Sequence, residues 1–357
     1  MLGSIALVGI AIAFALFAGT DGILRDARRV DVPVSSASRV LQFDQWRDGH
    51  SVLYETDLQR TTAVVGTYSV SSMTTQRVGT FPLPVHVDPK YGRYTDRVVH
   101  TDDAGRISPD GNWSIWCTGD RYEIVSLRTG ATTFVPMKVP RDEQAIDYWP
   151  YYCRSWTAWM PDSRRWVEMC PDRRGQPWLI VHALSGAVIS RTKFGVALAN
   201  SYLYEPYPGR PALLGVTPAE LVIAWDLGRT LYEIDLARSP AAVTQHNVEV
   251  PNEGALLDAV LSPDGNRILW RTHVEPPRWV QELRFRTRIP CAIGTHTLWI
   301  SNSDGGQVRQ LARESLSEAV EMSSDNPDYT FSTFRWLPGG KSISFVYDGK
   351  LWVYPVQ

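Results

Sequence analysis

Ile107-Ser108-Pro109-Asp110-Gly111-Asn112-Trp113-Ser114-Ile115-Trp116 and Leu261-Ser262-Pro263-Asp264-Gly265-Asn266-Arg267-Ile268-Leu269-Trp270 follow one pattern. In both stretches an apolar residue precedes a Pro-Asp-Gly turn, and a hydrophobic run follows it. Proline sets φ for the first central turn position, aspartate suits the second, and glycine accepts the positive φ that comes next. Each stretch therefore predicts a tight turn between two β-strands, and its recurrence predicts a repeat protein.

Four weaker copies keep the apolar run and part of the turn. Aligned on the fifth motif position, the six copies lie at Gly49, Gly111, Ser163, Glu220, Gly265 and Gly340, which are 45 to 75 residues apart. A second β-hairpin follows most copies, for example at residues 122–130 and 178–186, so that each unit has four strands. Units of this size with four strands are typical of the blades of a β-propeller.

The last unit is one strand short. After the two strands of its first hairpin, only one further β-prone stretch remains, at residues 350–356. The β-prone segment Val30-Asp31-Val32-Pro33-Val34 has no hairpin partner nearby, and we expect it to supply the missing outer strand. Pro33 suits an edge strand, where one N–H need not pair. The sequence thus predicts an all-β fold: a six-bladed propeller, with seven blades as the alternative, closed by an N-terminal strand and preceded by an N-terminal hydrophobic helix.

The Pro-Asp-Gly turns resemble the WD40-like (PD40-type) propeller repeats of the TolB family, over roughly residues 40–357. The resemblance implies the propeller fold. It also implies a binding role, since TolB-like propellers bind partner proteins of the cell envelope. It identifies no partner residue, because the repeated motif is a turn device and a fold does not decide a function.

Residues 2–18 carry no charge and are mostly apolar. Their number is at the short limit for a membrane span and also suits a signal peptide, with Ala13-Phe14-Ala15 as a cleavage site. We assign residues 1–24 to a signal peptide or single transmembrane anchor, 25–39 to a linker and the closing strand, and 40–357 to the propeller. The expected location is extracytoplasmic: periplasmic, secreted or membrane-anchored.

Composition argues against nucleic acid as a partner, because the net charge is −2 and no basic stripe stands out. Most of the 14 tryptophans fall within or just after predicted strands, and we expect them to pack between blades rather than to stack on sugars. Cys153 and Cys170 flank the third repeat hairpin. If Met160 pairs with Arg165, the two cysteines are diagonal neighbours across two strands. They could then form a disulfide, and the alternative is two buried thiols.

Connections between blades share one propeller face with those between second and third strands, and two of them are rich in aromatic residues. Tyr148, Trp149 and Tyr151 lie between blades two and three, and Tyr204 and Tyr207 lie between blades three and four. These side chains predict a rim that binds a peptide or a glycan. The alternative is that they pack with the neighbouring prolines and stiffen long loops.

The same face is predicted to receive polar residues that could bind a ligand, namely His100, Asp102, Asp226 and Asp328. No set of residues has metal-ligand spacing, and Asn302-Ser303-Asp304-Gly305-Gly306 is expected to be a plain hairpin turn rather than a calcium loop. We therefore predict no metal, no cofactor and no catalytic residue.

Two further segments are expected to decorate the propeller. Residues 271–296 carry five arginines with Trp279 and Phe285, which favours either a β-arm or a surface for an anionic partner. Residues 313–322 read as a helix with capping chemistry at its start.

The leading hypothesis is a non-catalytic scaffold that binds an envelope or extracellular protein, or a glycan, through these loops, and contacts the membrane only through its N-terminal segment. Enzyme activity stays open as the alternative: a propeller hydrolase of the glycosidase or metal-dependent lactonase type, with acids at the channel mouth. A prolyl-oligopeptidase type of enzyme is excluded, since the Gly-x-Ser-x-Gly elbow it needs does not occur.

Overall fold

The computed structural model describes residues 22–30, 39–47, 50–56, 62–69, 74–82, 86–88, 92–94, 106–118, 121–126, 128–136, 157–171, 177–193, 212–225, 229–238, 241–251, 254–274, 278–279, 282, 292–317, 334–337, 339–347 and 350–356. These residues form six four-stranded antiparallel sheets, one two-stranded sheet and the short helix α2 (Ile23–Asp26). The fold is an all-β propeller, as the repeat predicts.

Five of the six sheets are built from strands in chain order, four at a time. Their strands are β2 (Arg39–Arg47), β3 (His50–Thr56), β4 (Thr62–Ser69) and β5 (Thr74–Pro82); β8 (Arg106–Ile107), β9 (Trp113–Thr118), β10 (Arg121–Ser126) and β11 (Thr132–Pro136); β12 (Thr157–Trp159), β13 (Arg165–Pro171), β14 (Pro177–Ala183) and β15 (Val188–Lys193); β16 (Ala212–Val216), β17 (Leu221–Trp225), β18 (Thr230–Asp235) and β19 (Ala242–Asn247); and β20 (Ala255–Leu261), β21 (Arg267–Val274), β22 (Ala292–Asn302) and β23 (Arg309–Ser317). The two-stranded sheet pairs β6 (His86–Asp88) with β7 (Gly92–Tyr94).

The sixth sheet combines the two ends of the chain. It contains β24 (Arg335–Trp336), β25 (Ser342–Tyr347) and β26 (Lys350–Pro355), and β1 (Arg28–Val30) pairs with β26 as the outer strand. The predicted closing strand is therefore present, with Val30 opposite Leu351. It begins two residues earlier than expected, and residues 31–34, including Pro33, lie outside the described residues.

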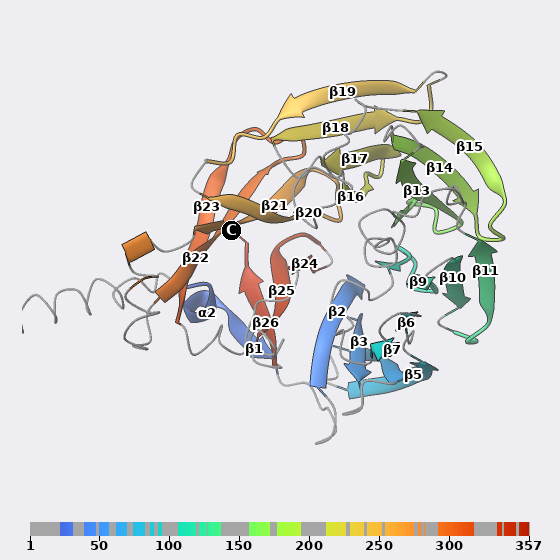
Figure 1. Ribbon diagram of the computed structural model, residues 1–357, viewed down its shortest axis with the longest axis horizontal. Helices are drawn as coiled ribbons and strands as arrows, with labels where there is room; N and C mark the ends of the chain where they lie inside the picture. Colours follow the sequence, from blue (N-terminus) through green and yellow to red (C-terminus); the bar gives the residue numbers. More distant parts are fainter. Residues whose placement is uncertain are drawn as a thin grey trace, which may run out of the picture.

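The sheets are arranged around a centre, with the first strand of each sheet innermost (Figure 1). Each first strand lies next to the first strand of the following sheet, in the order β2, β8, β12, β16, β20, β24 and back to β2. This arrangement positions the ends of all sheets on two opposite faces of the ring.

The repeated turn joins the first two strands of a sheet, and its fifth position is left-handed in every copy that the structure describes. The φ angles lie between 57° and 72° at Gly111, Ser163, Glu220, Gly265 and Gly340. In the strong copy at 261–270 the aspartate forms hydrogen bonds within the turn. The Asp264 carboxylate accepts hydrogen bonds from the Ser262 hydroxyl and from the backbone N–H of Asn266. The turn geometry, rather than the glycine itself, is thus the common element of the repeat.

Successive turns also contact one another across blades, and we name the turns at 108–113, 160–165, 217–221, 262–267 and 337–342 the turn ring. The Asp110 backbone N–H donates to the Ser163 hydroxyl at 2.9 Å, and Arg165 pairs with Glu220 at 2.7 Å. Arg267 donates to the backbone carbonyl of Gly340. Described turns on this face are therefore tied to turns of neighbouring blades.

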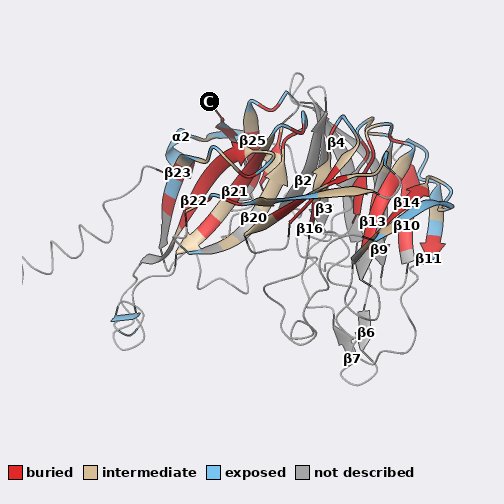
Figure 2. Cartoon of the chain, turned by 90° about the horizontal axis from the view of Figure 1, so that it is seen from above, coloured by how far each residue is buried: buried red, intermediate tan, exposed pale blue. Residues whose placement is uncertain are grey.

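Strands alternate their side chains between the two neighbouring blades. Clusters of buried side chains fill the spaces between sheets, and Figure 2 shows that many strand residues are buried. Tryptophans are prominent in these clusters, as predicted. Trp225 and Trp270 meet edge to face at 5.5 Å between the fourth and fifth sheets. The Trp336 indole N–H donates to the carbonyl of Val260, at 3.0 Å, between the sixth and fifth sheets. Large rings thus bridge the wedges between blades.

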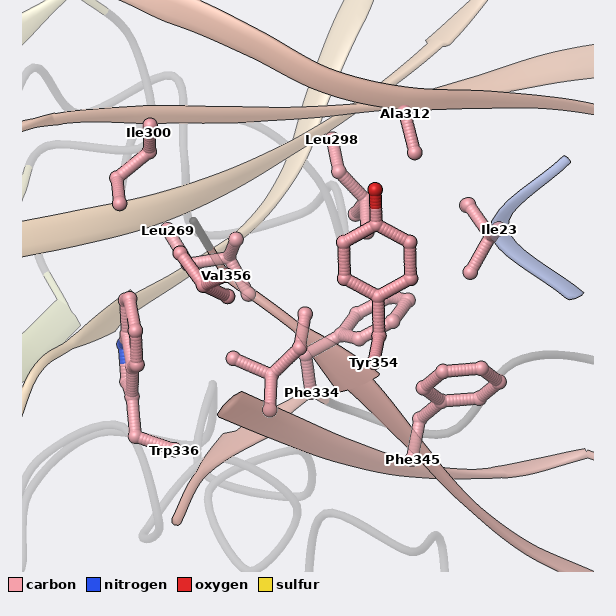
Figure 3. Close-up of a cluster of buried hydrophobic side chains, with 11 residues drawn as sticks. Ile23, Leu269, Leu298, Ile300, Ala312, Phe334, Trp336, Phe345, Tyr354 and Val356 are labelled. Carbon is pink, nitrogen blue, oxygen red and sulfur yellow. The ribbon is translucent and has the colours of Figure 1, made fainter. Parts of the chain in front are cut away.

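The N-terminal residues close the ring at the fifth and sixth sheets. Ile23 is fully buried in the cluster that contains Leu298, Phe345 and Tyr354 (Figure 3). At the next residue, the Leu24 backbone N–H donates to the Glu314 carboxylate on β23 at 3.2 Å. Helix α2 therefore fastens the closing strand to the neighbouring blade as well as to its own.

One predicted element is wrong. Residues 313–317 belong to strand β23, not to a helix, because they pair in register with β22, with Arg313 opposite Thr297 and Glu314 opposite His296. Cross-strand pairing here overrides the local helical preference. The predicted β-arm is confirmed in part, since β21 and β22 continue their pairing as far as Val274 and Thr295.

Candidate functional site

The predicted binding residues all belong to connections that leave the sheets at one face. His100 and Asp102 lie between β7 and β8, whereas Asp226 lies between β17 and β18. Tyr148, Trp149 and Tyr151 follow β11, Tyr204 and Tyr207 follow β15, and Asp328 follows β23. In an antiparallel four-stranded sheet, the blade strands that flank these connections begin or end opposite to the first turn, on the face opposite to the turn ring. The nine residues themselves lie outside the described residues.

The register of the third repeat hairpin is confirmed. The Met160 backbone N–H donates to the Arg165 carbonyl at 2.9 Å, and Trp159 lies opposite Trp166. Cys170 is at a β13 position opposite Trp178 of β14. Cys153 lies outside the described residues, so the disulfide stays a prediction.

A buried polar group between the second and third sheets was not anticipated from the sequence. Glu168 of β13 accepts a hydrogen bond from the Tyr122 hydroxyl of β10 and contacts His182 Nε2 of β14, each at 2.9 Å. The second ring nitrogen of His182 lies 3.3 Å from the carbonyl of Gly186. Trp166 stacks on the His182 ring at 4.1 Å between centroids and meets the Tyr122 ring edge to face at 5.0 Å.

This group resembles a catalytic arrangement in composition but not in access. Tyr122, Glu168 and His182 are 0%, 6% and 5% exposed, so that no substrate reaches them in this conformation. Both ring nitrogens of His182 face oxygen atoms, the Glu168 carboxylate and the Gly186 carbonyl. The three side chains therefore satisfy one another and join two blades.

A row of polar side chains crosses the fifth sheet. His273, His296 and Glu314 are opposite one another on β21, β22 and β23, and the two imidazole rings stack at 4.7 Å. Burial lowers the pKa of His296 to about 3, and the positive charges of Arg271 and His273 add to the effect. Burial also raises the pKa of Glu314, partly offset by the backbone N–H groups of Leu24 and Ile23 that it faces.

The sequence does not predict which side chains meet in either polar group. The alternation of Trp166 and Glu168 places both on one face of β13, which is a usable signal. Tyr122, on the adjacent blade, has no such signal, because its meeting with Glu168 depends on how two sheets pack.

Within the part of the chain that the structure describes, no three His, Cys, Asp or Glu side chains are placed to hold a metal ion. The segment 302–306 is a hairpin turn as expected, with the Asn302 N–H donating to the Gly306 carbonyl at 3.0 Å. The described residues include no helix with the length and apolar character to cross a bilayer. The apolar segment 2–18 lies outside them.

Comparison with known proteins finds no matching family model and no matching curated protein. Among solved structures the chain is similar to TolB from Acinetobacter baumannii, with 13% identity and a TM-score of 0.47 over 89% of this chain and 63% of that one. The chain thus spans less than two thirds of that protein. It is also similar to the putative TolB from Agrobacterium tumefaciens, with 13% identity and a TM-score of 0.45 over 81% of this chain and 79% of that one. A third similar structure is oligogalacturonate lyase from Vibrio parahaemolyticus, with 11% identity and a TM-score of 0.48 over 93% of each chain.

Proposed function

We propose that this chain is an extracytoplasmic, non-catalytic propeller that binds a protein of the cell envelope through the face opposite the turn ring. The observation that carries the proposal is the order of the strands. The blade strands that flank the connections with predicted binding residues begin or end at that face, whereas described turns that contact one another lie at the other face. Long connections held on a rigid ring are a common site for binding residues.

The proposal includes a closed ring of six blades. Six four-stranded sheets with neighbouring first strands support that number. It also includes membrane attachment or export through residues 2–18, which rests on their uncharged, apolar composition.

A capture experiment with the full chain tests the binding face. The tagged wild type is compared with a variant in which Tyr148, Trp149, Tyr204 and Tyr207 are changed to alanine. The matched control is Phe134→Ala with Ile189→Ala, which removes two exposed apolar side chains from outer strands β11 and β15. We expect an envelope protein that binds the wild type and the control but not the loop variant, with all three equally folded by circular dichroism.

Retention of the same partners by the loop variant would contradict the proposed face. Release of reducing ends from envelope glycans, lost in Asp102→Asn, Asp226→Asn or Asp328→Asn variants, would instead support a hydrolase with acids at the channel mouth.

A further inference from the structure

The indole of Trp166 carries a polar group that the packing of the second and third sheets does not use. Trp166 is 0% exposed, and in the described part of the chain its Nε1 N–H has no hydrogen-bond acceptor. The indole N–H groups of Trp270, Trp299 and Trp336, in contrast, each donate to a protein oxygen at 2.8 to 3.0 Å. A buried donor without a partner costs free energy, so folding alone does not explain its place.

The neighbouring Tyr122 has what Trp166 lacks, a base that can take up its proton. The Tyr122 hydroxyl donates to one oxygen of the Glu168 carboxylate at 2.9 Å. The other oxygen of Glu168 lies 2.9 Å from His182 Nε2, which fixes the carboxylate in place. A phenol that loses an electron becomes a strong acid. The Glu168 carboxylate can therefore accept the proton that Tyr122 would release on oxidation.

The contact between the two aromatic rings allows an electron to pass between them. The rings of Tyr122 and Trp166 meet edge to face, with their centroids 5.0 Å apart. Loss of an electron from either ring leaves a cation that is stabilised when it also loses its proton. Since Trp166 has no acceptor for that proton and Tyr122 has Glu168, the oxidised state is more stable on Tyr122.

Trp113 connects this group to the molecular surface. It is partly exposed and packs against the buried cluster that contains Tyr122, Trp159 and Trp166. Trp159 itself lies opposite Trp166 on the neighbouring strand of the third sheet. An electron can cross packed side chains without any reactant entering the protein. The burial that keeps a substrate from Tyr122 therefore does not prevent its oxidation.

From these observations we propose that Tyr122 is a buried electron donor that neutralises one-electron oxidants at the protein surface. The oxidant, of the class of oxygen-derived or carbonate radicals, gains one electron, which leaves Tyr122 through Trp166. The hydroxyl proton of Tyr122 moves to Glu168, so that a neutral tyrosyl radical and a carboxylic acid replace the phenol and the carboxylate. This role does not depend on the proposed binding face.

Photo-oxidation of the full chain tests the proposal. Ruthenium(III) tris-bipyridine, generated by light and persulfate, serves as the one-electron oxidant, and electron paramagnetic resonance of rapidly frozen samples distinguishes tyrosyl from tryptophanyl radicals. We expect a tyrosyl signal in the wild type, most of which is lost in Tyr122→Phe. The matched control is Tyr354→Phe, which should retain it. Tyr354 is also buried, but its hydroxyl donates to the carbonyl of Leu311, at 3.1 Å, which is not a base.

Two further variants test the proton acceptor and the electron path. Glu168→Gln keeps a hydrogen-bond acceptor beside Tyr122 but removes the base, and it should lose the same tyrosyl signal. Trp166→Phe keeps a ring in the cluster and should lower the tyrosyl yield. Circular dichroism confirms that each variant is folded. In the wild type, proton–deuteron exchange should change the hyperfine coupling of a hydrogen-bonded proton at the phenoxyl oxygen, which tests the site without any substitution.

The possible outcomes separate the parts of the proposal. A tyrosyl signal that Tyr122→Phe leaves unchanged, or no tyrosyl signal in the wild type, would overturn it. Full retention of the signal in Glu168→Gln would overturn the role of the carboxylate as proton acceptor. An unchanged yield in Trp166→Phe would overturn the electron path.

Discussion

At the scale of single residues, the repeat depends on one left-handed backbone position. Glycine occupies it in three of the five described copies, but Ser163 and Glu220 adopt φ of 57° and 61° there. Left-handed φ costs a residue with a Cβ about 1 kcal/mol relative to glycine. In both exceptions the side chain contacts a turn of a neighbouring blade: Ser163 accepts a hydrogen bond from Asp110, and Glu220 pairs with Arg165. Each contact offsets part of the cost of the left-handed backbone.

Replacement of Glu220 separates the backbone term from the ion pair. Glu220→Ala and Glu220→Gly both lose the pair with Arg165, but only the glycine variant relieves the left-handed strain. We expect the glycine variant to be more stable than the alanine variant by about 1 kcal/mol, measured by urea unfolding. Equal stabilities would mean that the turn relaxes out of the left-handed region.

Two glycines in corresponding hairpin turns differ only in their surroundings. Gly130 and Gly186 have φ of 72° and 80°. A Cβ at Gly130 meets nothing within 4 Å, whereas a Cβ at Gly186 lies 2.4 Å from Val135 on the neighbouring blade. Gly186→Ala should therefore cost about 1–3 kcal/mol more than Gly130→Ala in unfolding free energy, because it adds overpacking to the backbone strain. Similar costs would show that the two outer strands separate easily.

At the scale of elements, the second and third blades are joined by a polar contact as well as by apolar packing. Glu168→Ala leaves the Tyr122 hydroxyl and His182 without their shared acceptor, and we expect a loss of about 3–5 kcal/mol. Tyr122→Phe removes one hydrogen bond and should cost about 1 kcal/mol. In the double variant the loss should be smaller than the sum, because the orphaned hydroxyl is absent. Strict additivity in denaturant unfolding would argue against a connected group.

The fifth blade should lose stability on acidification. His296 has a pKa of about 3 in the folded chain and about 6.5 when unfolded, so the unfolded state binds the extra proton between these values. Stability from this group is thus complete above pH 6.5 and falls by about 1.4 kcal/mol per pH unit down to pH 3. Urea midpoints of the wild type and His296→Gln, measured from pH 3 to 8, should converge as pH falls. A constant difference would contradict the burial of a neutral imidazole.

The elements could be predicted where local rules and tertiary structure agree. The Pro-Asp turn set the register of the third hairpin, since Met160 and Arg165 pair as expected. Residues 313–317 show the opposite case, because their helical pattern yields to pairing with β22. The candidate site was predicted only as a set of connections. Which of their side chains meet depends on loop conformations that no periodicity encodes, just as Glu168 meets Tyr122 only through sheet packing.

At the scale of the whole molecule, ring closure rests on a short N-terminal segment. Strand β1 contributes only three residue pairs to β26, and both of its arginines are exposed, as is common for an edge strand. The fully buried Ile23 lies at one end of this segment and occupies the cluster between the last two sheets (Figure 3). Closure should therefore depend on Ile23 more than on the strand itself.

Ile23→Asp should detach this segment without unfolding the ring. Burying an unpaired carboxylate costs several kcal/mol, which exceeds what a short docked segment contributes, so the segment leaves the core instead. Once β1 departs, β26 becomes an edge, and the amide protons of residues 351–353 should exchange faster, while those of β13 and β14 keep their protection. Hydrogen exchange measured by mass spectrometry distinguishes the two regions. Ile189→Asp, on the exposed outer strand β15, is the matched control and should change neither. Faster exchange throughout the chain would mean that closure and the other blades unfold as one cooperative unit.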